Sequence, residues 1–466
     1  MEQRPIIVWF RQDLRVHDNE ALTKAVSTGQ PVIPVYVFDE RVFMGTTRFG
    51  FRKTGPFRAK FLLESVQNLQ SNLKKLGADL ILRTGKPEDE IYNVVKETHA
   101  ISVYCNRERT DEEVKVQDNL ERNLWTLGLE IQYFRGKMLF HTGDLPFPVS
   151  QTPDIFTHFR KEVEKYVPVR PPLPVPNGIP YLSMVKDVGF IPTLKDLNFE
   201  ESISTEEFDI SLKGGEDEAL ARLRYYLWDT DLIKQYKETR NGLLGLDYSS
   251  KLSPYLASGC LSPKLIYQEV KDYERSKGGN KSTYWLIFEL LWRDFFRFIA
   301  KKYGNEIFKI SGTAKQEKVS KTIDWEIFNK WASGQTGVPF IDANMRELNR
   351  TGFMSNRGRQ NVASFLVKDL KLNWLLGAEY FESLLIDYDP CSNYGNWNYV
   401  AGVGSDPREN RYFNILTQAR RYDPEGNFIR YWLPELKELS ESSIFAPKRG
   451  AINNYPAPLV DFSKWN

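Results

Sequence analysis

A dense group of reactive side chains lies between residues 387 and 397, where the sequence reads DYDPCSNYGNW. It brings acids, amides and an indole together directly after a helical pattern. Upstream, Asn356, Arg357 and Arg359 interrupt an apolar helical pattern, and in a buried helix such groups need polar partners. A single buried arginine–aspartate pair is more often a structural ion pair than a site. The density of polar groups here shifts the balance towards a binding or catalytic site.

Charge and length set broad limits on the protein. With 466 residues, the chain exceeds the size at which one hydrophobic core usually keeps growing, which predicts two domains. The net charge of +2 neither demands nor excludes nucleic acid. Between residues 344 and 360, however, four arginines accompany one acid, Glu347, which makes this stretch a candidate phosphate-facing patch. The arginines are Arg346, Arg350, Arg357 and Arg359.

The cysteines and histidines argue against metal and hydrolytic chemistry. Cys105, Cys260 and Cys391 are odd in number and widely spaced, so they indicate a reducing compartment and no zinc site. All four histidines precede residue 160, which leaves the second half without imidazole for acid–base work. Without a long apolar run or a signal peptide, we expect a soluble, cytoplasmic protein that carries no metal.

Short apolar runs alternate with helical patterns in the first part of the chain, which predicts a parallel, Rossmann-like α/β sheet. The helical patterns are clearest over residues 58–76 and 111–127. The first run is followed by RQDLRVHDN instead of a glycine-rich loop, so a dinucleotide-binding enzyme built on this sheet is disfavoured. The predicted strands are 6–10, 32–38, 80–82, 101–105 and 131–134.

Beyond the sheet the pattern changes twice. Residues 137–215 contain the proline-rich stretch 167–180, which favours extended backbone and predicts an interdomain connector with short helices of its own. Residues 216–466 then read as helices punctuated by glycine and proline. We therefore expect an α/β domain over 1–136, a connector over 137–215 and an all-helical domain over 216–466.

Several separate strings, in the same order along the chain, resemble the photolyase/cryptochrome flavoproteins and among them the DASH branch. They include WFRQDLRVHDN near the start, TRNGLLGLDYSSKLSPYLASGCLSP and STYWLIFELLWRDFFRF in the middle, and NWNYVAGVGSDPRENRYFN near the end. The resemblance implies an α/β antenna domain joined to a helical domain that binds FAD. It also implies 5,10-methenyltetrahydrofolate as antenna.

The resemblance assigns the flavin site. Tyr236 would contact the phosphates, Asp387 would pair with Arg359, Asp389 would reach the ring edge, and Asn393 would face N5. The run SSKLS offers amides and hydroxyls for the pyrophosphate, although a helix N-cap before Pro254 explains the same serines equally well. The full cofactor-binding set is Tyr236, Ser249, Ser250, Lys251, Leu252, Ser253, Glu289, Arg293, Asn356, Arg359, Asp387, Asp389 and Asn393.

Most tryptophans fill a helical core, but three match the electron-transfer chain of the family. By resemblance, Trp397 would lie next to the flavin, Trp374 farther out and Trp325 near the surface. The segment between Trp325 and the next tryptophan, Trp331, is shorter than in better-known photolyases.

The substrate residues also follow from the resemblance. Glu289 and Trp292 lie three residues apart, hence on one helix face. They would hydrogen-bond and stack on a damaged pyrimidine, with Arg293 beside them on a phosphate. An amphipathic helix whose Glu289 meets solvent is the alternative. Further DNA-backbone arginines would be Arg240, Arg357 and Arg411.

One departure from typical dimer photolyases bears on substrate choice. Tyr399 stands where they carry a second tryptophan, two residues after Trp397. Stacking contributes roughly 1–3 kcal/mol per base, whereas extruding a base from duplex costs a few kcal/mol. Single-stranded lesions, which are already unstacked, should therefore remain accessible, as the DASH resemblance also implies.

For the antenna, Glu112 or Glu113 could supply acidic contacts, although acids at a helix N-terminus are explained equally by the helix dipole. We thus expect a monomeric, light-dependent deoxyribodipyrimidine photolyase-type lyase that acts on single-stranded DNA. The alternative is a blue-light photoreceptor that binds nucleic acid and signals or regulates transcription with little repair.

Overall fold

A five-stranded parallel sheet forms the first part of the protein, in the strand order β3-β2-β1-β4-β5. The computed structural model describes residues 4–199, 212–316, 319–404, 412–448, 452 and 454–465. β1 is apolar and buried at every position, as expected for a strand covered on both faces. The strands are β1 (Ile6–Phe10), β2 (Val32–Asp39), β3 (Ile81–Gly85), β4 (Ser102–Asn106) and β5 (Ile131–Phe134).

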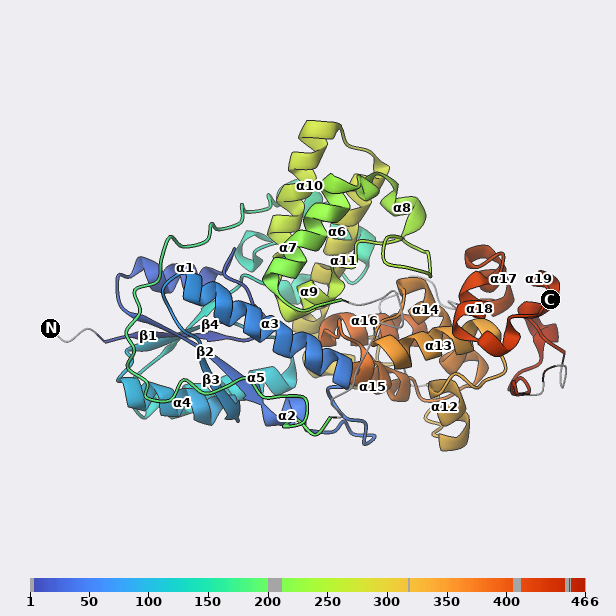
Figure 1. Ribbon diagram of the computed structural model, residues 1–466, viewed down its shortest axis with the longest axis horizontal. Coiled ribbons are helices and arrows are strands. Elements are labelled where there is room, and N and C mark those ends of the chain that lie inside the picture. The colour runs from blue at the N-terminus through green and yellow to red at the C-terminus, as the bar shows by residue number, and fades with distance from the viewer. Residues whose placement is uncertain are drawn as a thin grey trace. The chain divides into compact units, whose positions relative to one another are not determined.

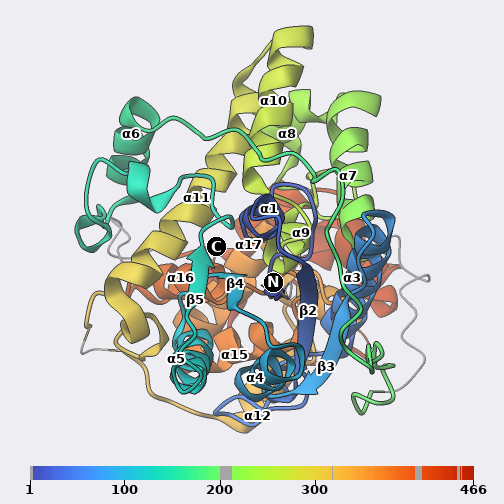
Figure 2. The ribbon, with the colours of Figure 1, turned by 90° about the vertical axis from the view of Figure 1, so that its left-hand side faces the viewer.

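Helices cover both faces of this sheet. α4 and α5 lie on one face, and α1 and α3 on the other (Figure 2). Residues of α4 and α5 share one buried apolar cluster with β1 to β4. The parallel, Rossmann-like α/β domain predicted from the sequence is thus confirmed. Its helices are α1 (Glu20–Ser27), α2 (Glu40–Phe43), α3 (Pro56–Lys75), α4 (Pro87–Thr98) and α5 (Asp111–Trp125).

The reversal of strand order between β1 and β4 is where open α/β sheets often bind ligands. Here polar groups of the chain bond to one another at that point. The Asp13 carboxylate accepts from the Arg11 amide at 2.7 Å and from Asn106 Nδ2 at 2.5 Å. The Asn106 side chain accepts from the Gly136 amide at 2.9 Å. The first turn of the loop after β1 therefore uses its polar groups to hold the loop in place.

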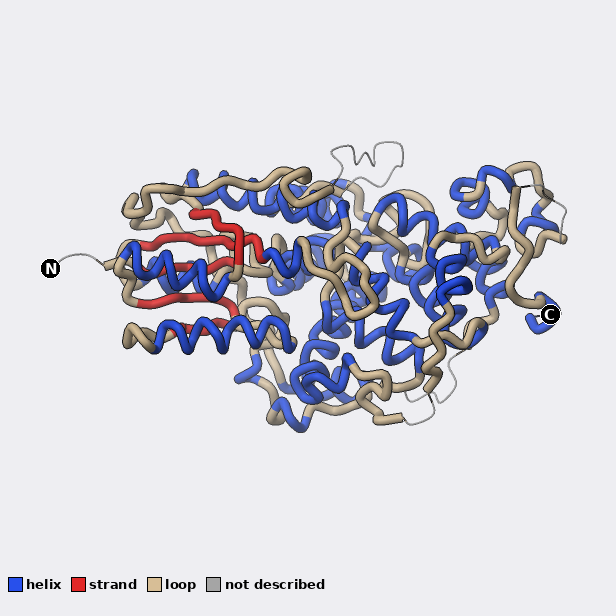
Figure 3. The backbone as a smooth tube through the Cα atoms, turned by 90° about the horizontal axis from the view of Figure 1, so that it is seen from below, coloured by secondary structure: helices blue, strands red, loops and turns tan. Residues whose placement is uncertain are grey.

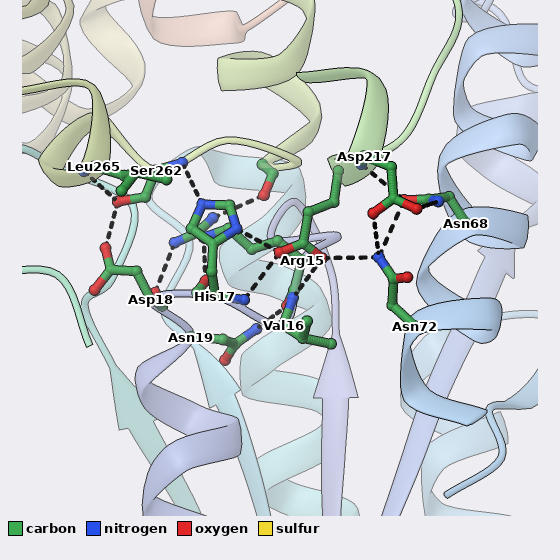
Figure 4. Close-up of polar contacts among 12 residues, drawn as sticks. Arg15, Val16, His17, Asp18, Asn19, Asn68, Asn72, Asp217, Ser262 and Leu265 are labelled. Atoms are coloured by element: carbon green, nitrogen blue, oxygen red, sulfur yellow. Dashed lines mark hydrogen bonds and ion pairs between the residues drawn. The ribbon is translucent and has the colours of Figure 1, made fainter. Parts of the chain in front are cut away.

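The rest of this loop is anchored by buried polar groups (Figure 4). The Glu216 carboxylate accepts from the amides of Val16 at 2.9 Å and His17 at 3.0 Å, and it also contacts the His17 ring. Arg15 donates to the carbonyls of Gly259 and Gly136, each at 2.8 Å. Segments that are far apart in sequence are thereby fixed to the sheet.

The chain divides into two compact units. The first, here called the sheet unit, comprises Met1–Ile203, Leu212–Lys237 and Lys251–Gly304. It holds, besides the sheet, α6 (Phe156–Tyr166), α7 (Glu216–Arg224), α9 (Ser253–Ser258), α10 (Pro263–Lys277) and α11 (Lys281–Tyr303) (Figure 1). The predicted boundaries at residues 136 and 215 separate domains and a connector, which is a different division from that into compact units, and they stay a prediction.

The second compact unit, the helical unit, comprises Ser204–Ser211, Glu238–Ser250 and Asn305–Asn466. The described part of this unit contains helices and no strands (Figure 3). α8 (Tyr236–Thr239) crosses the division. The other helices are α12 (Trp325–Ala332), α13 (Pro339–Thr351), α14 (Asn356–Ser364), α15 (Trp374–Leu384), α16 (Pro390–Ala401), α17 (Ile415–Tyr422), α18 (Asn427–Trp432) and α19 (Glu441–Ile444).

The proline-rich connector has a helix of its own, α6, as predicted. After α6 its backbone follows the sheet: the amides of Val32 and Leu82 donate to the carbonyls of Pro180 and Val188 at 2.6 and 2.8 Å. Backbone groups of an extended, helix-free segment are satisfied in this way.

Candidate functional site

Arg359 and Asp387 form an ion pair in the helical unit, with Arg359 Nη2 donating to Asp387 Oδ2 at 2.9 Å. Arg359 projects from the first turns of α14, and its Nε donates to the Met354 carbonyl at 2.9 Å. The Asp387 side chain is 4% exposed and that of Arg359 is 25% exposed. The predicted pairing is confirmed, and it holds a guanidinium at a partly open position.

Asp389 and Asn393 occupy the start of α16. The Asp389 carboxylate caps the helix by accepting from the Ser392 amide at 2.8 Å, while its side chain is almost fully buried. Asn393 Nδ2 donates to the Ala378 carbonyl of α15 at 3.0 Å. Both side chains are therefore fixed by the backbone of neighbouring turns, which preorganises their remaining oxygen atoms.

Trp397 lies one helical turn after Asn393 and is buried. Its ring packs edge to face on Phe381, with centroids 5.2 Å apart. It also lies directly over Gly377, where an added Cβ would come within 2.2 Å of the indole. The close packing of α15 on α16 thus depends on a residue without a side chain at position 377.

The other two predicted relay tryptophans differ in exposure. Trp374 is fully buried, and its indole N–H donates to the Ile310 carbonyl at 3.0 Å. Trp325, the first residue of α12, is 44% exposed, and its ring meets Phe328 at 5.7 Å. An exposed Trp325 fits the predicted terminal position near the surface.

The predicted phosphate loop falls on the division between the units: Ser249 and Ser250 belong to the helical unit, and Lys251, Leu252 and Ser253 to the sheet unit. Lys251 is buried and has a left-handed backbone, with φ of 57°. The N-cap of α9 is Leu252, without a side-chain cap bond, so the alternative of a serine N-cap before Pro254 is wrong. Tyr236 is buried, with its ring 6.3 Å from that of Tyr226.

α11 carries the predicted substrate residues of the sheet unit. Trp292 stacks on Phe156 of α6, with ring centroids 3.7 Å apart and planes 10° apart. Glu289 lies one turn before it and is half-buried. Arg293 donates to the carbonyls of Lys137 at 2.7 Å and Leu256 at 3.1 Å. Its phosphate contact stays a prediction, while its observed bonds join α11 to α9 and to the segment that follows β5.

The remaining predicted arginines have diverse partners. Arg357 donates to Asn241 Oδ1 at 3.0 Å and lies over the Tyr422 ring at 4.5 Å. Arg346 pairs with Glu435 at 2.6 Å. Arg346 and Arg359 thus both have carboxylate partners within the chain, and the phosphate-facing role of the four-arginine patch stays a prediction. Of the other predicted residues, Arg240 and Tyr399 are half-buried, Arg350 and Asn356 are exposed, and Arg411 lies outside the described residues.

The two antenna candidates have different surroundings in the sheet unit. Glu112 is exposed and pairs with Lys53 at 2.5 Å. Glu113 accepts from the Thr110 hydroxyl at 2.5 Å, and burial, followed by the charge of Glu108, raises its pKa. Both acids lie in the first turn of α5, so the helix-dipole explanation also stands.

Sequence reasoning missed the aromatic partners Phe156, Phe381 and Trp331. Trp331 is fully buried, and its ring is parallel to Phe381 within 16°, with centroids 6.4 Å apart. No sequence spacing signals such contacts, because they join different helices. Among the described residues, no group of His, Cys, Asp and Glu could hold a metal ion, and no helix is long and apolar enough to cross a membrane.

Comparison with known proteins agrees with this architecture. A family model for the FAD binding domain of DNA photolyase matches residues 285–466, and one for DNA photolyase matches residues 6–177. Cryptochrome DASH of Gloeobacter violaceus is 50% identical over 99% of this chain and 94% of its own length. Cryptochrome DASH of Xenopus laevis is 48% identical over 99% of this chain and 91% of its own.

Solved structures give the same result. A cryptochrome of Synechocystis sp. is 48% identical, has a TM-score of 0.95, and is matched over 100% of this chain and 98% of its own. A class III photolyase from Agrobacterium tumefaciens is 30% identical, with a TM-score of 0.86 over 100% and 96% of the two chains. Fold and family models together define a FAD-binding protein of the photolyase and cryptochrome class. Within that class, the chain belongs to the cryptochrome DASH family.

The donor set of the helical unit fits a flavin ring. The pyrimidine edge of isoalloxazine carries carbonyl acceptors and N–H donors, which call for both donors and acceptors on the protein. Arg359 in α14 supplies a guanidinium, Asp387 and Asp389 before α16 supply carboxylates, and Asn393 in the first turn of α16 supplies an amide. These four residues would hold the ring.

Proposed function

We propose that this protein repairs cyclobutane pyrimidine dimers in single-stranded DNA by light-driven electron transfer from reduced FAD. The observation that carries the proposal is the position of Glu289 one helical turn before Trp292 on α11, where Phe156 stacks on the indole with centroids 3.7 Å apart. A carboxylate beside a fixed aromatic surface suits a base that has left its strand, since such bases are held by stacking and edge hydrogen bonds.

FAD, when bound, reduced and excited by blue light, supplies an electron to the dimer and recovers it after the cyclobutane carbon–carbon bonds have broken. The residues of the chain position the reactants. Glu289 hydrogen-bonds the damaged base, and Trp292 stacks on it. Arg240, Arg357 and Arg411 neutralise backbone phosphates, which gives affinity without sequence preference.

Tyr399 supports the choice of single-stranded DNA. Extrusion from duplex costs a few kcal/mol, and a tyrosine offers less stacking area than the tryptophan of typical dimer photolyases. A lesion in a single strand or a loop does not carry this cost. The proposal therefore predicts a large preference for dimers outside duplex.

The test compares one thymine dimer in single-stranded DNA, in a loop and in duplex at fixed salt, with chemically reduced protein under blue light. We expect rapid repair of the first two substrates and slow repair of the duplex. Tyr399→Trp should narrow the gap, whereas the control Tyr399→Phe should not. Glu289→Gln should slow repair of all three, because its hydrogen bond is to the dimer.

Equal repair of duplex and single strand would refute the extrusion argument. Absence of repair on every substrate, with normal light-driven flavin reduction, would favour the alternative, a blue-light photoreceptor that binds nucleic acid and signals.

The proposal also covers the compartment, the oligomeric state and the antenna chromophore of the protein. We place the protein, as a monomer, in a reducing cytoplasmic compartment, which is compatible with its buried free cysteines. We also propose 5,10-methenyltetrahydrofolate as antenna. Glu112 and Glu113 are its candidate contacts in the sheet unit.

A further inference from the structure

A group of cations lies in the sheet unit where two neighbouring strands end. Arg107 directly follows β4, and Arg135 directly follows β5. The Arg107 amide donates to the Phe134 carbonyl at 2.9 Å, so the strand pairing continues to this point and the two arginines leave the sheet side by side. The group, here called the basic cluster, comprises Arg107, Arg109, Arg135 and Lys301.

The segment after β5 and the end of α11 bring the other two cations to this place. The segment runs along α11, where the Phe140 amide donates to the Asp294 carboxylate at 2.8 Å. Two residues later, Thr142 accepts from Arg109 Nη2 at 3.4 Å. Lys301 lies about two helical turns after Asp294, in the last turn of α11. The cluster is thus built from two strand ends, a loop and a helix end.

The neighbouring carboxylates are engaged elsewhere. Glu108 pairs with Lys137, and Glu20 accepts from the backbone amide of Arg135 at 3.3 Å. Within the part of the sheet unit that the structure describes, no carboxylate forms an ion pair with a member of the basic cluster. The fold therefore gathers positive charge at this position without balancing it.

Mutual repulsion of the cations is evident in their acidity. Partial burial and the charges of the three arginines lower the pKa of Lys301 to about 8. Burial, followed by the charge of Arg135, lowers the pKa of Arg109 to about 10, although Glu108 acts in the opposite direction. Like charges held together cost the folded chain stability, and a ligand of opposite charge removes that cost.

We propose that the basic cluster binds an anion that carries several phosphate groups. Each guanidinium can donate two hydrogen bonds to one phosphate, and Lys301 adds a compact charge. This site is separate from the proposed repair site: Lys301 lies nine residues after Trp292, about two and a half turns, and so on the opposite side of α11. The phosphate chain of a nucleotide and the backbone of a nucleic acid share this chemistry.

The first test measures acylation of each lysine by an amine-reactive ester, quantified by mass spectrometry of the whole chain after digestion. At pH 8 Lys301 should react readily, and inorganic tripolyphosphate should protect it, because an anion favours the charged ammonium. Lys96, exposed on α4, is the internal control and should react equally with and without the anion. Sodium sulfate at the same ionic strength controls for screening.

The second test measures the affinity for tripolyphosphate from the rise in Tm. Arg135→Gln and Lys301→Met should each weaken binding about tenfold, as the loss of one charge-assisted hydrogen bond does. Without the anion, neither variant should have a lower Tm, because repulsion within the cluster is relieved. Lys96→Met is the matched control and should bind like the unmodified protein. Unchanged affinity in both cluster variants would overturn the site.

An undamaged deoxythymidine oligonucleotide and adenosine triphosphate distinguish the two sources of phosphate. Protection of Lys301 by the oligonucleotide at the lower phosphate concentration assigns the site to nucleic acid, and protection by the triphosphates alone assigns it to nucleotides. Equal protection by sulfate, or protection by none of these anions, refutes the proposal even if a variant fails to fold. Repair is not a readout here, so a failure of the proposed function leaves this result standing.

Discussion

Arg359 and Asp387 show how single residues prepare the site. Asp387 is nearly inaccessible to water, and its partner guanidinium is a quarter exposed. Losing one member of such a pair leaves the other charge poorly compensated. At the same time, both groups supply atoms that fit the polar edge of a flavin, so the pair links stability to cofactor retention.

Asp387→Ala should therefore lower both the free energy of unfolding and flavin content. We expect about 3 kcal/mol, the lower end for breaking a buried pair, because Arg359 is partly solvated. Urea unfolding and the ratio of flavin to protein absorbance measure the two effects. Asp387→Asn, which keeps the shape and one acceptor, is the control and should retain more flavin. Full flavin occupancy in Asp387→Ala would remove Asp387 from the site.

The sequence could supply the chemistry of individual residues but not their packing partners. The Arg359–Asp387 pair was predicted because both residues lie in recognisable motifs and a buried charge demands a partner. The stack of Phe156 on Trp292 and the contact of Phe381 with Trp331 were not predicted. They depend on which helices meet side by side, and spacing along one helix reports only which residues share its face.

At the scale of elements, the packing of α15 on α16 fixes Trp397. Gly377 is the residue of α15 over which the indole lies, so the two helices approach more closely than any side chain at that position would permit. Leu366 also borders the same space, within 2.7 Å of an added Cβ. The position of Trp397 therefore requires a residue without a Cβ at position 377.

Gly377→Ala should displace Trp397 and cost about 1–3 kcal/mol in unfolding free energy, as overpacking of a core does. The same substitution should slow photoreduction of the flavin, because the displaced Trp397 indole loses its present ring contacts. Gly178→Ala is the control, since its new Cβ would lie no closer than 3.8 Å to Leu76. Unchanged stability and photoreduction in Gly377→Ala would show that α15 and α16 can move apart to accommodate a methyl group without cost, and would refute the argument from close packing.

The strands of the sheet could be predicted one by one, because each is a continuous apolar run in the sequence. β1 and β5 begin and end where the sequence predicts, and the others differ by one or a few residues. The role of Glu216 was not predictable: its carboxylate caps the amides of the loop after β1, some 200 positions away. This contact holds α7 in the sheet unit, although periodicity alone assigned α7 to the helical domain.

At the scale of the whole molecule, each compact unit buries a carboxyl whose pKa is high. Burial raises the pKa of Asp294 in the sheet unit and of Asp342 in the helical unit, each to about 6. An unfolded chain has an ordinary aspartate pKa of about 4. The folded protein therefore binds these protons first as pH falls, and both carboxyls contribute less stability as pH rises from about 4 to about 6.

Asp342 also ties the last described segment of the chain to α13. It accepts from the Thr336 amide at 2.7 Å, from the Gly337 amide at 3.0 Å and from the Tyr455 hydroxyl at 2.6 Å. The Leu459 amide donates to the Thr336 carbonyl at 2.9 Å. These donors favour the ionised carboxylate and partly offset the cost of its burial.

Tyr455→Phe should therefore raise the pKa of Asp342 further and destabilise the protein more at pH 8 than at pH 5. A hydrogen bond to a charged group contributes about 1.5–3 kcal/mol, and the charge exists only above the folded pKa. Urea unfolding of both proteins at each pH measures the difference. Tyr380→Phe is the control, because its hydroxyl donates to neutral Asn349 at 2.6 Å and should show no such pH dependence. An equal loss at pH 5 and pH 8 in Tyr455→Phe would show that Asp342 does not titrate in this range.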